Sequence, residues 1–239
     1  MRELRADMIP DEFAGTGAVV LVGGDSAETA DYLDSVSNPA PYVLLLVLGL
    51  TFVLLTVVFR SVVIAGTAVV LNLLSVGAAY GLLVLVFQHG IGAGLFGFSH
   101  VETIEAWVPL FLFSVLFGLS IDYQVFLLSR IRERYDASGD TGDAVLHGVA
   151  ATARIITGAA LIIVAVFLGF AMGDLVMFQQ MGFGVAVALL LDATVIRSVV
   201  LPSAMKLLGS WNWYLPRWLE WLPRLHAEGA APVSPVELS

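Results

Sequence analysis

Five long apolar stretches constrain what this chain can fold into more than any other feature of its sequence. They lie at about 41–59, 62–87, 106–129, 155–173 and 177–204. A helix that crosses a membrane needs about 20 mostly apolar residues, because each residue adds about 1.5 Å along the helix axis. The sequence therefore predicts an all-α polytopic membrane protein with five transmembrane helices.

The composition agrees with a membrane protein. Of the 239 residues, 59% are hydrophobic and only 13% are charged, which leaves too little charge to cover the surface of a soluble domain. The net charge of −9 argues against nucleic acid as a partner, since a nucleic-acid-binding protein is expected to be basic. The absence of cysteine excludes a disulfide framework and a thiolate metal site.

Arginine and lysine are distributed unevenly between the two ends of the predicted spans. One side receives Arg60, Arg130, Arg132, Arg134, Arg154, Lys206, Arg217 and Arg224, whereas the other receives Arg2 and Arg5. Cytoplasmic loops of membrane proteins carry an excess of these residues. We therefore expect a multi-pass protein of the plasma (inner) membrane, with its N-terminus outside and its C-terminus in the cytoplasm.

We assign the membrane domain to residues 41–208. The regions before and after it differ in their expected structure. Residues 1–40 are interpreted as the C-terminal remnant of an external domain, with a strand at 17–24 and a helix at 25–36 that Asp25 and Glu28 begin as a capping box. One strand and one helix cannot form a core alone. Residues 209–225 mix Trp and Tyr with arginine, which predicts an amphipathic helix at the membrane surface, and 226–239 are expected to be disordered.

Asp122 is the residue that most needs an explanation, because it lies in the third apolar stretch. A carboxylate in the hydrocarbon costs about 2.5–3.5 kcal/mol, so it must face protein or water. Ser114, Gly118 and Asp122 recur every four residues and form a small, polar stripe suited to close helix contact. Such a carboxylate can gain and lose a proton during a cycle. The alternative is that Asp122 snorkels at the end of its span or makes a structural contact. Tyr123 points about 100° away from Asp122 and faces a different neighbour.

The fifth stretch holds a second pair of charges, Asp192 and Arg197. A spacing of five is unfavourable for a pair within one α-helix, where residues three and four apart are neighbours. Asp192 ends another stripe of small residues, so it is either a second relay group or a contact to another helix, and we expect Arg197 to mark the cytoplasmic boundary. In the second stretch, Asn72 and Ser75 are interpreted as packing residues. The sequence shows no catalytic, metal or cofactor constellation, which predicts that the chain is not an enzyme and uses no cofactor.

Several segments resemble the MmpL-type transporters of the resistance–nodulation–division superfamily. They are "LNLLSVGAAYG" (71–81), "FGLSIDYQVFLLSRIRERY" (117–135), "GVAATARIITGAALIIVAVFLGF" (148–170), "GFGVAVALLLDATVIRSVVLPSAM" (182–205) and "WNWYLPRWLEW" (211–221). The resemblance implies twelve spans in two related halves, each with a large external domain after its first span. The five spans of this chain then correspond to the last five spans of the second half. They would form one of the two halves of the family's helical bundle, without the first span of that half.

The same resemblance implies roles for individual residues. Members of this family use two Asp-Tyr motifs as a proton relay, and Asp122 with Tyr123 matches the copy in the tenth span. We therefore expect export of lipids or other hydrophobic compounds, driven by the proton motive force, with protons as the coupling ion and the missing N-terminal half as partner. A lipid-regulatory protein similar to sterol-sensing members, a split transporter and a non-functional truncated product remain alternatives.

Overall fold

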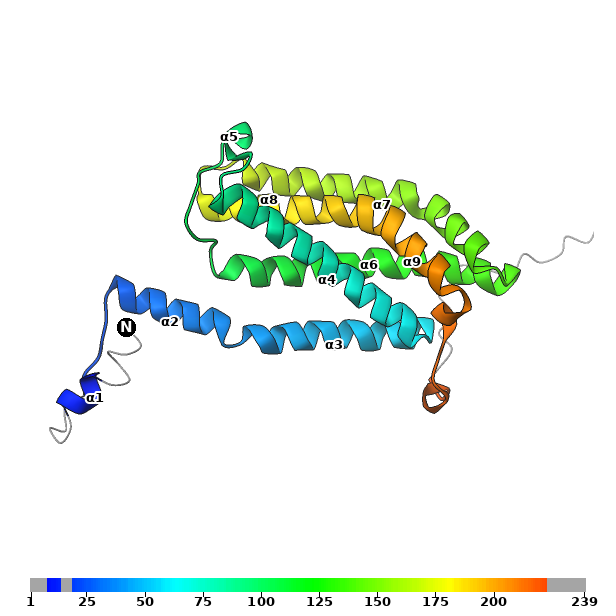
Figure 1. The fold of residues 1–239 in the computed structure, drawn as a ribbon, viewed down its shortest axis with the longest axis horizontal. Coiled ribbons are helices and arrows are strands. Elements are labelled where there is room, and N and C mark those ends of the chain that lie inside the picture. The colour runs from blue at the N-terminus through cyan, green and yellow to red at the C-terminus, as the bar shows by residue number, and fades with distance from the viewer. Residues whose placement is uncertain (1–7, 14–18, 223–239) are drawn as a thin grey trace, which may run out of the picture.

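The structure, a computed structural model, describes residues 8–13 and 19–222. It is a set of helices (Figure 1). The helices are α1 (Ile9–Glu12), α2 (Asp25–Ser37), α3 (Ala40–Phe59), α4 (Val62–Leu83), the π-helix η2 (Val84–Gln88), α5 (Ala93–Phe96), α6 (Trp107–Ser138), α7 (Thr141–Ala171), α8 (Val176–Leu191), the π-helix η3 (Asp192–Val200), α9 (Leu201–Leu208), and the 3₁₀ helices η4 (Gly209–Trp213) and η5 (Arg217–Leu219). Helices α3, α6, α7 and α8 run roughly along the long axis, and α4 crosses obliquely (Figure 1). No strand occurs within the described residues. The prediction of an all-α polytopic membrane protein is thus confirmed.

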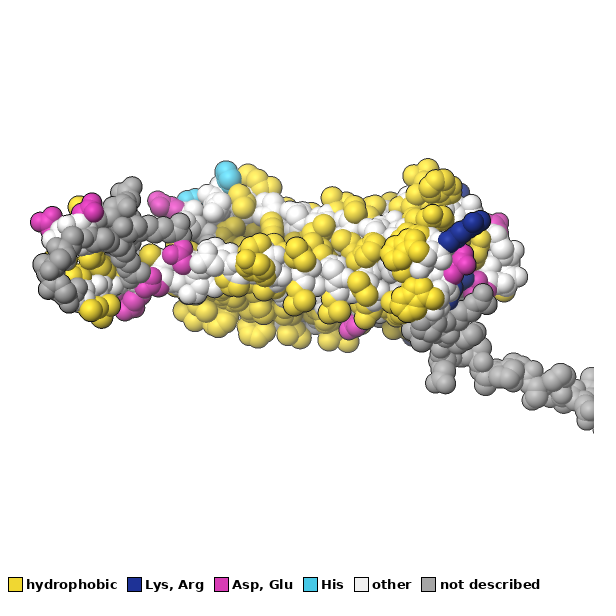
Figure 2. All heavy atoms as spheres, turned by 90° about the horizontal axis from the view of Figure 1, so that it is seen from below, with side chains coloured by type: hydrophobic (Ala, Val, Ile, Leu, Met, Phe, Trp, Pro, Cys, Tyr) yellow, Lys and Arg dark blue, Asp and Glu magenta, His cyan; other side chains and the backbone are white. Residues whose placement is uncertain are grey.

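Five continuous helical segments are long and apolar enough to cross a membrane. They run over Asp25–Phe59, Val62–Gln88, Trp107–Ser138, Thr141–Ala171 and Val176–Trp213, and each overlaps one predicted span. Apolar side chains cover the sides of the molecule along its length, while charged side chains gather mainly towards its two ends (Figure 2). This distribution is the one that a hydrocarbon layer requires of a multi-pass protein.

The N-terminal prediction is only partly met. The helix expected at 25–36 is present as α2, but it begins after Gly24, and Asp25 lies inside the helix and does not form a capping box. Residues 17 and 18 lie outside the described residues, and 19–24 form no strand. The external-domain remnant is therefore not seen as an α/β unit.

The polar segment at 130–150, between the third and fourth predicted spans, is helical almost throughout, because α6 continues to Ser138 and α7 begins at Thr141. Ion pairs three and four residues apart support the end of α6, including the pair of Arg130 with Glu133. Asp140 then caps α7, since its side chain accepts a hydrogen bond from the amide of Gly142 at 2.7 Å.

Two clusters of buried apolar residues hold the bundle together. One cluster includes Leu83, Phe117 and Leu189, and the other includes Leu71, Leu127 and Ile196. On α4, on α6 and along α8 with η3, the chain passes from one cluster into the other. The buried residues that lie between the clusters on these three segments are polar, and most of them belong to the site described below.

The segment at 209–222 differs from the predicted amphipathic helix. It forms the two short helices η4 and η5, joined by extended residues, and residues 223–239 lie outside the described residues. Arg60, at the turn between α3 and α4, donates hydrogen bonds to the carbonyl oxygens of Leu222 and Glu220. Ser61 donates to the carbonyl oxygen of Asn212, whose own side chain is buried. The segment is therefore held against the bundle by backbone and side-chain hydrogen bonds, which a surface helix does not need.

Candidate functional site

Helix α6 carries two polar faces at the same depth of the bundle. Ser114, Gly118 and Asp122 lie on an exposed face, whereas Ser120 and Gln124 are buried against other helices. We call the first set the outer stripe. Asp122 is only two residues from Ser120, which lies between the two apolar clusters. Asp122 is thus close to the middle of the bundle, away from the end where a side chain would snorkel.

The outer stripe makes no close helix contact within the described residues. A β-carbon added at Gly118 would have open space around it, with no atom within 4 Å. The hydroxyl of Ser114 is turned back to the carbonyl oxygen of Leu110, at 2.9 Å. The stripe was predicted to serve helix packing, and along this chain that surface is uncovered. It is therefore available to another polypeptide segment.

The buried face is organised by an ion pair between Asp192 and Arg197. Nε of Arg197 lies 2.8 Å from Oδ2 of Asp192, and each residue keeps only 3% of its surface exposed. A spacing of five is unfavourable in an α-helix, yet the pair forms here. The cause is η3, because a π-helix has i→i+5 hydrogen bonds and brings positions i and i+5 closer together than an α-helix does. The position of Arg197 at the cytoplasmic boundary stays a prediction.

Side chains from α4 and α6 complete this buried network. Nη2 of Arg197 donates to the carbonyl oxygen of Ser120 at 2.7 Å and to its hydroxyl at 2.8 Å. The hydroxyl of Ser120 lies 2.8 Å from Oδ1 of Asn72 and 3.2 Å from Oδ2 of Asp192. The amide of Gln124 donates to the same oxygen of Asn72 at 3.2 Å. We call these residues, Asn72, Ser120, Gln124, Asp192 and Arg197, the buried polar network.

The geometry gives the hydroxyl of Ser120 a choice between two acceptors. A serine hydroxyl has one proton to donate, so it can donate fully either to Asn72 or to Asp192 at any moment. When it points to Asn72, Arg197 alone satisfies Oδ2 of Asp192. The network can therefore rearrange its hydrogen bonds without moving a backbone atom.

Tyr123 lies between the two polar faces of α6. Its half-buried ring is 5.3 Å from the guanidinium carbon of Arg197, within the range of a cation–π contact. Its neighbour in sequence, Asp122, belongs to the outer stripe. The two residues predicted as the proton relay are thus in different surroundings, as their angular separation indicated. Their role in proton transfer stays a prediction.

Sequence reasoning missed most of the buried polar network. Asn72 was interpreted as a packing residue, and Ser120 and Gln124 were not singled out. The available signal was their spacing of four residues on the face of α6 opposite Asp122, which places two polar side chains on one buried surface. Asp192 was recognised, and its alternative as a helix contact matches its place against α4 and α6.

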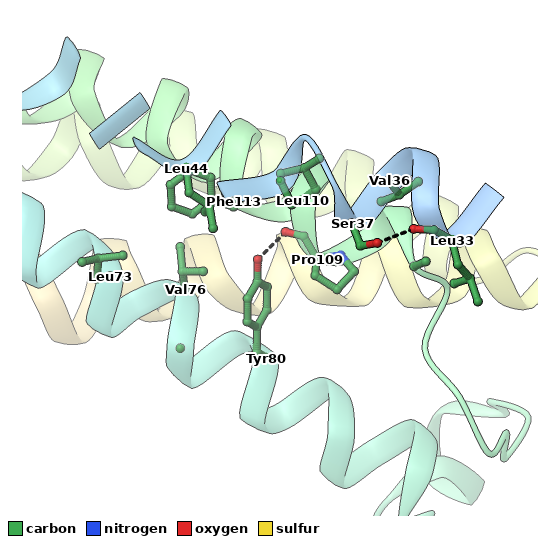
Figure 3. Close-up of a pocket in the computed structure, with 13 residues that line it drawn as sticks. Leu33, Val36, Ser37, Leu44, Leu73, Val76, Tyr80, Pro109, Leu110 and Phe113 are labelled. Carbon is green, nitrogen blue, oxygen red and sulfur yellow. Dashed lines mark hydrogen bonds between the residues drawn. The ribbon is translucent and has the colours of Figure 1, made fainter. Parts of the chain in front are cut away.

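An apolar groove opens between α2, α3, α4 and the start of α6 (Figure 3). Its volume is about 580 Å³, and its walls include Leu33, Leu44, Val76, Leu110 and Phe113. The hydroxyl of Tyr80 points into the groove and donates to the carbonyl oxygen of Pro109, which joins α4 to α6. None of the described side chains that line the groove is charged. The groove suits an apolar chain more than a polar ligand.

The fold and these sites define a class: a polytopic helical membrane protein with ionisable groups at mid-depth. The chain belongs to the MMPL family, whose model matches residues 4–227. This confirms the resemblance to MmpL-type transporters that the sequence segments indicated.

Curated relatives agree with this family. The chain is 46% identical, over 92% of its length, to a protein of Mycolicibacterium smegmatis named mycolic acid-containing lipids exporter MmpL11, of which it covers 23%. It is 48% identical, over 84% of its length, to a protein of Mycobacterium tuberculosis named heme uptake protein MmpL11, and covers 21% of it. It is 39% identical, over 91% of its length, to a trehalose monomycolate exporter, MmpL3 of Mycolicibacterium smegmatis, and again covers 21%. The chain thus spans less than a quarter of the length of these relatives.

Proposed function

We propose that the chain forms part of an exporter of lipids that is driven by the proton motive force. The observation that carries this proposal is the exposed carboxylate of Asp122 at the middle of an apolar bundle. Because a charge facing hydrocarbon is costly, another protein segment must cover it or it must take up a proton. The family, and the names of two relatives as lipid exporters, support the assignment.

Protonation of Asp122 is the chemical step that the proposal requires. A proton from outside neutralises the carboxylate and removes the penalty for placing it in an apolar contact. The outer stripe then packs differently against the covering segment, which we assign to the N-terminal half of the transporter. Tyr123, the next residue along α6, is proposed as the hydrogen-bonding member of the relay on the side that faces Arg197. Release of the proton to the cytoplasm restores the first arrangement and completes one cycle.

The cargo is proposed to be a lipid whose apolar chain enters the groove between α3, α4 and α6. With the N-terminus outside, as the arginine distribution indicates, this groove opens towards the outer half of the membrane. One relative is named a heme uptake protein. Heme carries two carboxylates, and the absence of charged side chains among the described residues that line the groove favours a neutral apolar chain. Lipid is therefore the preferred cargo.

A vesicle assay with one substitution tests the proton step. The chain is reconstituted with the N-terminal half of the transporter, a proton gradient is imposed, and movement of a mycolic acid-containing lipid is measured for the wild type and for Asp122→Asn. We expect Asp122→Asn to insert normally and to lose at least about tenfold of the gradient-dependent rate, in line with the loss of a group that transfers protons. Asp174→Asn, at an exposed turn, is the matched control and should transport normally.

The outcomes separate the proposal from its alternatives. Full transport by Asp122→Asn would contradict the relay. Lipid binding without any response to the gradient would favour a lipid-regulatory protein. Binding of heme in place of the lipid, measured by absorbance titration, would change the cargo and leave the relay untouched.

A further inference from the structure

A small cavity lies against the buried polar network, between α4, α6 and η3. It is lined by Asn72, Ser75, Leu116, Ser120 and Asp192. The cavity leaves about 10 Å³ of room for the centre of a water molecule. That is close to the smallest volume, about 10–15 Å³, in which a buried water is accommodated. The space is sufficient for one molecule and no more.

Two of the residues that line this cavity have a polar atom without a partner among the described residues. Nδ2 of Asn72 has no acceptor, and Oδ1 of Asp192 has no donor. Both residues are 3% exposed, so bulk water does not satisfy these atoms. An unsatisfied buried polar atom is destabilising by roughly 1–3 kcal/mol, and more when the group is charged. A donor and an acceptor left over at one cavity are complementary to a molecule that both accepts and donates.

We infer that this cavity binds one water molecule, which accepts a hydrogen bond from Asn72 and donates one to Asp192. Its second proton has an acceptor in the hydroxyl oxygen of Ser75, because that hydroxyl uses its own proton on the carbonyl oxygen of Ala188, at 3.3 Å. The water then makes three hydrogen bonds, the usual number for a buried water. It joins α4 to η3 at a point where no described side chain does so directly.

The chemistry of the site selects water over a metal cation. Asn72 presents its amide nitrogen here, since its oxygen already accepts from Ser120 and Gln124. An amide nitrogen with two protons repels a cation. The charge of Asp192 is also already balanced by Arg197, at 2.8 Å, so a sodium ion would add an uncompensated positive charge to a buried site. A neutral molecule adds none.

The bound water gives each oxygen of Asp192 a donor. Arg197 donates to Oδ2, and the water donates to Oδ1. With a donor at each oxygen, Asp192 stays paired with Arg197, and the pair supports the i, i+5 contact within η3. The water site is independent of whether the chain transports lipid.

The test uses the full chain in lipid nanodiscs and a substitution that fills the cavity. Ser75→Thr keeps the hydroxyl and adds a methyl group towards this space, and Ser114→Thr makes the same change on the exposed face of α6. We expect Ser75→Thr to lower the midpoint of thermal unfolding by about 2–4 °C. Ser114→Thr should leave the midpoint unchanged. A structure at a resolution that shows ordered water should place a peak about 2.6–3.2 Å from both Nδ2 of Asn72 and Oδ1 of Asp192.

Two results would overturn this inference. The first is an empty cavity in a wild-type structure that shows other buried waters, a measurement that does not depend on whether Ser75→Thr folds. The second is a midpoint that rises when sodium replaces choline at constant ionic strength, since this would identify a cation as the occupant. An unchanged midpoint with sodium and a peak in the cavity together support water.

Discussion

The two polar faces of α6 lie at one depth of the bundle and have opposite surroundings. Asp122, on the outer stripe, is exposed, whereas Ser120 and Gln124 join a network that is nearly closed to solvent. The buried carboxylate of Asp192 has its ion-pair partner, Arg197, within the same chain. An exposed carboxylate in an apolar region requires a partner from elsewhere. The comparison separates residues that build this bundle from residues that connect it to another.

The largest difference between the faces should appear when one charge is removed from each. Arg197→Met leaves Asp192 buried without its partner, so we expect it to lower the free energy of unfolding by about 3–5 kcal/mol. Asp122→Asn removes an exposed charge and should change it by less than about 0.5 kcal/mol. Denaturant unfolding in detergent micelles measures both. The double variant Asp192→Leu/Arg197→Met should recover much of the loss, and equal effects of the two single substitutions would contradict the distinction between the faces.

A smaller difference is expected from two glycines that face different surroundings. A β-carbon at Gly182 would lie 2.4 Å from the carbonyl oxygen of Phe167 and 2.5 Å from the amide of Ala171, so Gly182→Ala must push α8 away from α7. We expect this substitution to lower the free energy of unfolding by about 1–3 kcal/mol. Gly118→Ala, on the outer stripe, has open space and should stabilise the helix by about 0.5–1 kcal/mol. Thermal unfolding of the two variants gives the comparison, and a destabilising Gly118→Ala would show that the stripe is already covered.

The smallest effect concerns an exposed ion pair that serves as a reference for the buried one. The guanidinium of Arg134 donates to the carboxylate of Asp143 at 2.6 Å, and this hydrogen bond lowers the pKa of Asp143 below its ordinary value of about 3.9. The folded-state pKa is lowered, so the contribution of the pair is complete above the ordinary value and is lost as the pH falls through the lowered one. Titration of the Asp143 side chain by NMR should show the lowered pKa, and Arg134→Gln should raise it again. An unchanged pKa in Arg134→Gln would remove this pair as the cause.

The parts of the fold that were predictable from the sequence are those that hydropathy determines. The five spans follow from the length of the apolar runs, and the segment around Asp122 indicated the family. The end of α6 was not predicted, because a charged segment after an apolar span is typical of a loop. Here the charges form ion pairs at i, i+3 and i, i+4, and such pairs stabilise a helix. The strand expected at 17–24 is not seen at the described residues 19–24, because an apolar run shows that a strand is possible and does not show what the strand pairs with.

Some residues of the candidate site were predictable from the sequence, but the contacts between them were not. Asp122, Tyr123 and Asp192 were recognised from their charge or motif. The pairing of Asp192 with Arg197 depends on a π-helix, and an α-helical repeat places these residues on different faces. The sequence also did not show which way the outer stripe faces. Small polar residues every four positions indicate a contact with another helix, but they do not indicate whether that helix belongs to the same chain.

The hydrogen bonds of Arg60 and Ser61 have a consequence for how the chain is made. Ser61 bonds to a carbonyl group 151 residues later in the sequence. A ribosome that adds about 5–20 residues per second needs roughly 8–30 s to reach it. Until then the turn between α3 and α4 lacks the partner that Ser61 binds in the folded bundle. Residues around Asn212, which are made late, therefore close a hairpin that is made much earlier.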